Sequence, residues 1–230
     1  MHTLSISQRS CRRPRTRLDA LRGRRELAFG TVGLPAHRLE AMPRFIHLNG
    51  PPGIGKSTLA QLYVDDHPGV LNLDIDQLRG MIGGWQNRFA ETGEIARPIA
   101  LGMARTHLGR GRDVVMPQYL GSLSEIGRFE AVAVDTGAAF VEVILMDSKE
   151  RSIQRFSSRG DDDELAWHRQ VRDIVDRTGG EALLAGMYDQ LAEVIRTRTN
   201  AVVVSSVAGA LRQTYEAVAA ILDEANSTYP

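Results

Sequence analysis

A chain of 230 residues is long enough to bury one large hydrophobic core, and its 24% charged and 43% hydrophobic residues are typical of a soluble globular protein. No apolar run reaches the roughly 18 residues that a membrane-spanning helix needs, and a net charge of zero gives no reason to expect nucleic acid as an obligatory partner. The single cysteine, Cys11, excludes an internal disulfide framework and favours a reducing, cytoplasmic location.

The beginning of the chain differs in composition from the rest. Ten arginines against three acidic residues give residues 1–44 a charge of +7, so the remainder carries −7. Little apolar periodicity is present, which predicts disorder. Three interpretations remain open: a basic arm for nucleic acid or membrane, a targeting peptide, or translated sequence upstream of a start at Met42. We favour a dispensable leader over 1–43, followed by one domain over 44–230.

From residue 44 onward, segments with strand and helix patterns alternate. This alternation predicts an α/β fold in which a parallel sheet is covered by helices on both faces. In such sheets ligands bind beyond the carboxyl ends of the strands, so functional residues are sought there. The predicted strands are 44–49, 70–74, 113–117, 139–146 and 201–206, and the predicted helices lie near 56–66, 94–109, 122–136, 148–159, 163–177, 181–197 and 208–224.

The segment after the first strand, GPPGIGKS, matches the pattern G-x-x-x-x-G-K-[ST]. In this pattern backbone amides surround the phosphates, Lys56 reaches the β and γ oxygens, and the Ser57 hydroxyl binds Mg²⁺. An apolar strand before the loop and a helical pattern after it are the context that the motif requires. We therefore predict a nucleoside triphosphate site that uses ATP and Mg²⁺. Its predicted residues are Gly50, Pro51, Pro52, Gly53, Ile54, Gly55, Lys56, Ser57 and Thr58.

The second strand is followed by carboxylates and an arginine in the stretch NLDIDQLR. If a helix opens at Asp76, then Asp76 and Arg79 share one face of it. Asp76 can accept the proton of an attacking hydroxyl, and Arg79 can hold a polar or anionic acceptor. The alternative is that Asp76 only caps the helix and Arg79 is solvated. We predict that Asp76 is catalytic and that Asp74 and Arg79 bind substrate.

Two further regions are predicted to contribute to an acceptor pocket. Gln118 and Tyr119 follow the third strand, although they are equally compatible with an ordinary loop. Segment 81–98 is expected to form much of the pocket, with Trp85 offering a flat apolar surface unless it is part of the core. Adenine is expected near the turn after the fifth strand, at 206–209.

The segment after the fourth strand places three arginines on one face of a helix, because Arg151, Arg155 and Arg159 are spaced four residues apart. Arginines that close over a transferring phosphoryl group stabilise its charge and exclude water. We predict a lid over about 148–178 in which Arg155 and Arg159 are catalytic; a solvated basic face is the alternative.

At the start of this segment, Asp147 and Glu150 have the D-x-x-E spacing of a capping box. We interpret Asp147 as the cap of the lid helix, in preference to a metal-binding acid.

Four stretches together resemble a known group of enzymes: GPPGIGKSTLA, GVLNLDIDQLR, VVMPQYL and RSIQRFSSRG. They are similar to the small P-loop kinases of the zeta-toxin, gluconate-kinase and chloramphenicol-phosphotransferase group, and to the kinase domain of phage polynucleotide 5′-kinase. The resemblance covers residues 44–206. It implies a three-layer α/β/α fold with a five-stranded, mainly parallel sheet in the order 2-3-1-4-5, as in adenylate kinase, and a helical arginine lid.

The resemblance also implies a role for each matching residue. Asp76 would be the general base and Arg79 a binder of the acceptor, while Lys56 and Ser57 would be the phosphate and Mg²⁺ ligands. The lid arginines would be Arg155 and Arg159.

The function that follows is transfer of the γ-phosphate from ATP to a hydroxyl of a small molecule, such as a sugar, a nucleoside or an antibiotic. The alternative is a kinase acting on the 5′-hydroxyl of RNA or DNA ends. A charge of −7 over residues 45–230 disfavours nucleic acid, because a groove for a polynucleotide needs positive charge. A GTPase is disfavoured because its guanine-binding motif N-K-x-D is not found.

Overall fold

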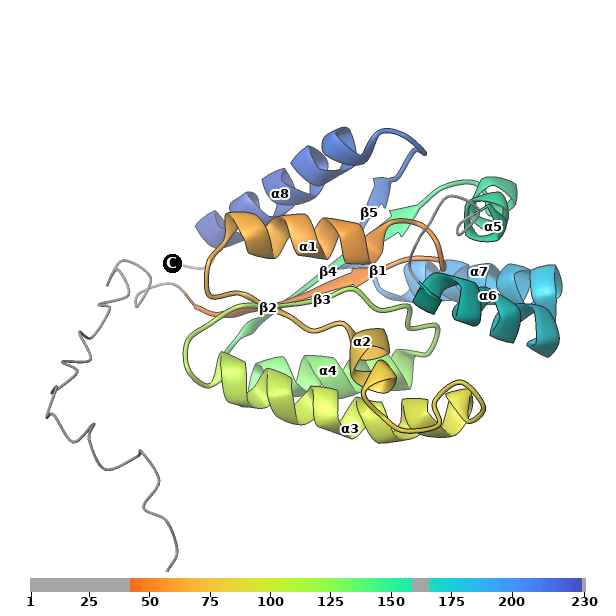
Figure 1. Cartoon of the computed structure of the whole chain (residues 1–230). Helices are drawn as coiled ribbons and strands as arrows, with labels where there is room; N and C mark the ends of the chain where they lie inside the picture. Colours follow the sequence, from red (N-terminus) through yellow and green to blue (C-terminus); the bar gives the residue numbers. More distant parts are fainter. Residues whose placement is uncertain (1–41, 159–165, 229–230) are drawn as a thin grey trace, which may run out of the picture. The chain divides into compact units, whose positions relative to one another are not determined.

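A computed structural model describes residues 42–158 and 166–228. The predicted leader lies outside these residues except for Met42 and Pro43. Five parallel strands form one sheet in the order β2-β3-β1-β4-β5, which confirms the predicted fold class and strand order (Figure 1). The strands are β1 (Arg44–Asn49), β2 (Leu71–Asn72), β3 (Val114–Met116), β4 (Ala139–Met146) and β5 (Val202–Ser205).

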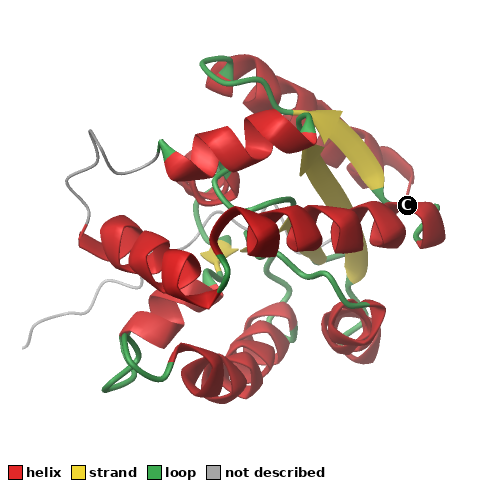
Figure 2. Ribbon diagram, turned by 90° about the vertical axis from the view of Figure 1, so that its right-hand side faces the viewer, coloured by secondary structure: helices red, strands yellow, loops and turns green. Residues whose placement is uncertain are grey.

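Helices cover both faces of the sheet. α1 and α8 lie on one face, and α3, α4 and α7 lie on the other (Figures 1 and 2). The helices are α1 (Lys56–Asp66), α2 (Ile75–Gly80), α3 (Phe89–Leu108), α4 (Leu123–Asp135), α5 (Lys149–Ser157), α6 (Ala166–Thr178), α7 (Gly180–Thr197) and α8 (Leu211–Thr228).

The central strand β1 is buried along its whole length because it contacts both helical layers. Side chains alternate across a strand, so Phe45 packs with the α3–α4–α7 layer and Ile46 packs with the α1–α8 layer. A strand buried on both faces reads as a continuous apolar run, which is why β1 is easy to recognise in the sequence. Its carboxyl end therefore delivers the next residues to a fixed place.

The helices around the presumed pocket segment differ most from the prediction, and β2, β3 and β5 are shorter than predicted. α3 begins at Phe89, five residues before the predicted start, so half of the presumed pocket segment 81–98 is helical. Pro98 lies inside this helix, as it does in the predicted one, and the pairs Arg88–Glu91 and Glu94–Arg97 support the first turns. A short helix, α2, follows β2 directly.

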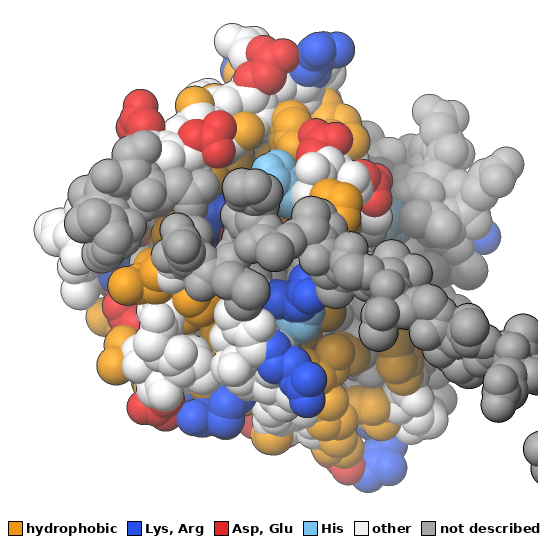
Figure 3. Space-filling model, turned by 90° about the vertical axis from the view of Figure 1, so that its left-hand side faces the viewer, with side chains coloured by type: hydrophobic (Ala, Val, Ile, Leu, Met, Phe, Trp, Pro, Cys, Tyr) orange, Lys and Arg blue, Asp and Glu red, His pale blue; other side chains and the backbone are white. Residues whose placement is uncertain are grey.

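The opposite end of the sheet, where the strands begin, is closed by a buried ion pair. Arg44 donates to Asp113 from Nε and Nη2, at 3.1 and 2.7 Å, and also donates to the Tyr63 hydroxyl and the Leu222 carbonyl. It thereby joins β1 to α1 and α8. Acidic, basic and apolar side chains are mixed on the visible part of this end (Figure 3). No helix in the described part of the chain is both long and apolar enough to cross a membrane.

Candidate active site

The loop between β1 and α1 encloses the ammonium group of Lys56. Lys56 is the first residue of α1 and is 9% exposed, and its Nζ donates to the Gly50 and Pro51 carbonyls at 2.8 and 2.9 Å. The partly exposed Ser57 follows on the first turn of the helix. The positive end of the helix dipole, the loop amides and the ammonium group are therefore together, which is the arrangement that binds phosphates.

Gly53 allows the helix after β4 to pack directly on this loop. Its φ is +80°, and a Cβ at this position would lie 2.9 Å from the Cα of Phe156 on α5. Any larger residue would push α5 away from the loop. The first part of the predicted lid is therefore held against the phosphate-binding loop.

Arg155 of α5 adds polar bonds to the same contact. Its Nη2 donates to the Ile54 carbonyl at 2.8 Å, and its Nη1 donates to the Ser206 carbonyl at 2.6 Å. Arg155 thus links the phosphate-binding loop, α5 and the residues after β5, whereas the predicted catalytic Arg159 lies outside the described residues.

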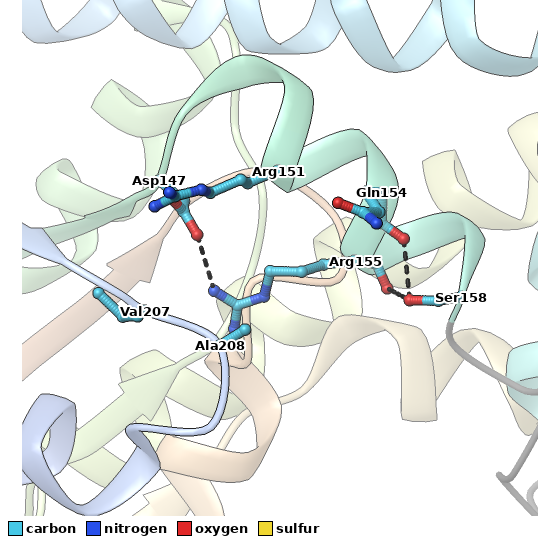
Figure 4. Close-up of a pocket in the computed structure, with 7 residues that line it drawn as sticks. All are labelled: Asp147, Arg151, Gln154, Arg155, Ser158, Val207 and Ala208. Carbon is cyan, nitrogen blue, oxygen red and sulfur yellow. Dashed lines mark hydrogen bonds and ion pairs between the residues drawn. The ribbon is translucent and has the colours of Figure 1, made fainter.

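A pocket of about 470 Å³ lies beside Arg155, between α5 and the turn that connects β5 to α8 (Figure 4). Val207 and Ala208 belong to the turn in which we predicted adenine to bind. The lining residues are Asp147, Arg151, Gln154, Arg155, Ser158, Val207 and Ala208.

The interpretation of Asp147 as the helix cap is wrong. The cap of α5 is Ser148, whose hydroxyl accepts from the backbone N–H of Arg151, because the helix begins one residue later than a cap at Asp147 requires. Asp147 is 7% exposed at its side chain, and its Oδ2 lies 3.6 Å from Arg155 Nη1. Asp147 therefore orients the arginine at the edge of the pocket (Figure 4).

The three charged residues after β2, Asp74, Asp76 and Arg79, make different contacts. Asp74 caps α2, since its Oδ1 accepts from the backbone N–H groups of Asp76 and Gln77. Asp76 therefore is not the cap. It pairs with Arg79 at 2.5 Å, and 40% of its side-chain surface is exposed, so a substrate can reach it.

The environment of Asp76 favours a proton acceptor. Although 40% of its side-chain surface is exposed, the surrounding protein displaces water from the carboxyl group, and this desolvation raises the pKa of Asp76. The positive charge of Arg79 partly opposes this rise. Lys56 of the phosphate-binding loop is close enough to lower the same pKa. A carboxylate with a raised pKa accepts a proton more readily once it is ionised, which suits general base catalysis.

The other predicted pocket residues are placed differently from one another. Gln118 is partly buried, and its Oε1 has no hydrogen-bond partner within the described residues. The Tyr119 hydroxyl donates toward the Met187 carbonyl and Gln190, and burial raises the pKa of Tyr119 to about 12. Trp85 is 6% exposed, as the alternative of core packing expects. Substrate binding by these three residues stays a prediction.

Asn49, the last residue of β1, is a further residue of the site that was not predicted from the sequence. Its Oδ1 accepts from the N–H groups of Gly50 and Leu120, and its Nδ2 donates to the Leu120 carbonyl. Asn49 thus fixes the start of the phosphate-binding loop to the loop after β3. A polar side chain at the end of a wholly buried strand is a signal that the sequence did contain.

Comparisons with known proteins agree with the fold that holds this site. The family described as "AAA domain" matches residues 45–179, more than half of the chain. A gluconokinase from Sinorhizobium meliloti 1021 has a similar structure, with 20% identity, a TM-score of 0.56, and coverage of 82% of this chain and 96% of its own. The tunicamycin resistance protein of Deinococcus radiodurans shows 16% identity, a TM-score of 0.51, and coverage of 78% and 95%. None of the curated proteins compared matches. The chain thus has a P-loop kinase fold.

Proposed function

The chain belongs to the AAA domain family, and from this premise we propose that it is an ATP-dependent kinase that phosphorylates a hydroxyl group of a small molecule. The observation that carries the proposal is the position of Asp76, which follows β2 at the same carboxyl edge of the sheet where Lys56 follows β1, with 40% of its side-chain surface exposed. A proton acceptor beside a phosphate-binding loop is what transfer to a hydroxyl needs. The single cysteine supports a cytoplasmic location.

In the proposed reaction the loop from Gly50 to Ser57 binds the phosphates and Lys56 contacts the β and γ oxygens. Asp76 takes the proton of the acceptor hydroxyl, whose oxygen forms a bond to the γ-phosphorus while the bond to the β–γ bridging oxygen breaks. The pocket beside Arg155 would hold the adenine. Arg155 lies between this pocket and the phosphate-binding loop, because it donates to the Ile54 carbonyl, and it would contribute positive charge on the phosphate side.

Mg²⁺ fits the residues of the loop. A hydroxyl at the first turn of α1, contributed by Ser57, is a suitable oxygen ligand, and Mg²⁺ usually retains waters and binds substrate phosphates for the rest of its coordination. When bound, the ion would neutralise charge on the phosphates; Ser57 would hold it.

The acceptor is tested with a panel of sugars, nucleosides, antibiotics and 5′-hydroxyl oligonucleotides in the presence of ATP and Mg²⁺. We expect mass spectrometry to find one small molecule that gains a phosphoryl group. Repeating the reaction at several salt concentrations separates the alternative, since binding of an oligonucleotide falls steeply with salt. Phosphorylation of oligonucleotide ends alone would replace our proposal with that alternative.

Replacing Arg155 with alanine is expected to lower the rate of phosphoryl transfer by about 10²–10³-fold, because a preorganised positive group near the γ-phosphate is lost. The dissociation constant of ATP should change by less than about tenfold. Single-turnover transfer and calorimetry measure the two quantities. Arg196→Ala is the control, since Arg196 is exposed and pairs with Glu193. Equal losses of rate and affinity would show that Arg155 instead holds the nucleotide in the ground state.

A further inference from the structure

The guanidinium group of Arg79 is fixed from two sides. Its Nη1 donates to Asp76 Oδ1 at 2.5 Å, within α2. Its central carbon lies 3.9 Å from the centre of the Phe89 ring, at the start of α3, in a cation–π contact. Because the Arg79 side chain is only 8% exposed, this placement separates its charge from solvent.

A glycine in α3 makes room for this group. Gly93 lies inside the helix, where glycine is less favourable than alanine. A Cβ at this position would lie 2.8 Å from Arg79 Nη2, which is closer than packed atoms approach. Gly102 in the same helix is different, because a Cβ there would meet no atom within 4 Å. The missing side chain of Gly93 therefore provides the space that the guanidinium occupies.

We propose that Phe89 and Gly93 are positioning residues, which hold the Arg79 guanidinium against Asp76 and thereby fix the direction of its carboxylate toward the acceptor hydroxyl. This inference rests on the proposed function, because it takes Asp76 as the general base. The bond from Arg79 uses Oδ1, so Oδ2 takes the proton of the acceptor. Arg79 then acts through Asp76. The resemblance to other kinases implies a different role, in which Arg79 binds the acceptor itself.

The charges around Asp76 determine what displacement of Arg79 does. Arg79 of α2, Lys56 of α1 and Arg97 of α3 lower the pKa of Asp76, whereas burial and Asp74 raise it. Arg79 has the largest of the lowering effects. Moving its guanidinium away should therefore raise the pKa of Asp76. Because a general base acts in its ionised form, activity would then be lost at a higher pH on acidification.

The test compares Gly93→Ala with Gly102→Ala, a matched control that also places an alanine in α3. The new Cβ at position 93 meets the end of a flexible side chain, so the guanidinium can move while the helix stays in place. Carboxyl ¹³C NMR titration of the full-length protein without nucleotide measures the pKa of Asp76. We expect a rise in Gly93→Ala and none in Gly102→Ala. Phe89→Leu, which removes the cation–π contact, should produce a smaller rise.

The kinetic readout uses water as the acceptor, through the slow hydrolysis of ATP–Mg²⁺ expected of a kinase without its substrate. Gly93→Ala should lower kcat by about 10–10²-fold, as expected for a misplaced catalytic group, and leave the KM for ATP unchanged. The acid limb of its pH profile should move to higher pH. The double variant Gly93→Ala/Gly102→Ala should have the same kcat and pH profile as Gly93→Ala alone.

These experiments distinguish failure of this inference from failure of the proposed function. If the Asp76 pKa and kcat of Gly93→Ala and Phe89→Leu equal those of Gly102→Ala, the inference is overturned and the proposed function stands. If Asp76→Asn leaves hydrolysis and transfer unchanged, the proposed role of Asp76 fails whatever the glycine variants do.

Discussion

Replacing Lys56 with alanine is expected to abolish phosphoryl transfer, with a loss of at least about 10²–10³-fold. The ammonium group is the positive charge that the phosphate-binding loop encloses through the Gly50 and Pro51 carbonyls. Without it, the charge that develops on the γ-phosphate loses a preorganised partner. Thermal stabilisation of the protein by ATP–Mg²⁺ should also decrease, because the ground-state phosphates lose the same contact.

The chain offers a matched control, because its one other lysine, Lys149, lies on α5 and pairs with Asp189 at 2.7 Å. Lys149→Ala removes the same charge from the surface and should keep nearly the full rate. Transfer is measured under single-turnover conditions with saturating ATP. If Lys56→Ala kept the full rate of transfer, the phosphate-binding loop would have no role in the reaction.

The second large effect is expected from Asp76→Asn, which should lower kcat by about 10²–10⁴-fold, the usual contribution of a general base. ATP binding should remain nearly intact, since proton transfer occurs in the transition state and not in the nucleotide complex. Asp74→Asn should cost less, because Asp74 caps α2 with an oxygen that an asparagine retains. A larger loss in Asp74→Asn would mean that the base is assigned to the wrong carboxylate.

The pH profile gives an independent measure of the same residue. Burial raises the pKa of Asp76 above the usual value of an aspartate. Because activity requires the ionised form, the rate should begin to fall at a higher pH than for an ordinary aspartate as the solution is acidified. This acid limb should vanish in Asp76→Asn, and its persistence would assign the limb to another group.

Much of the fold could be predicted because its signals are local. β1 is apolar along its length, and the glycine-rich loop and the helix after it follow within a few residues. The early start of α3 could not be predicted in the same way, because the stabilising pairs around Arg88 and Glu94 look like ordinary surface charges in the sequence.

The candidate site was predictable in its residue types and less so in their contacts. Lys56 and Asp76 follow strands, so the carboxyl edge of the sheet brings them together. The cap at Ser148 depends on where α5 begins, and the contact of Gly93 with Arg79 joins two helices whose packing the sequence does not state. Such contacts between elements require the three-dimensional structure.

Movement of the γ-phosphate to a hydroxyl oxygen can be followed directly by ³¹P NMR of ATP–Mg²⁺ incubated with the acceptor found in the panel. We expect the γ-phosphate signal to fall while a phosphomonoester signal grows by the same amount, and we expect neither change with Lys56→Ala. Release of inorganic phosphate alone, with the acceptor present and unmodified, would contradict it.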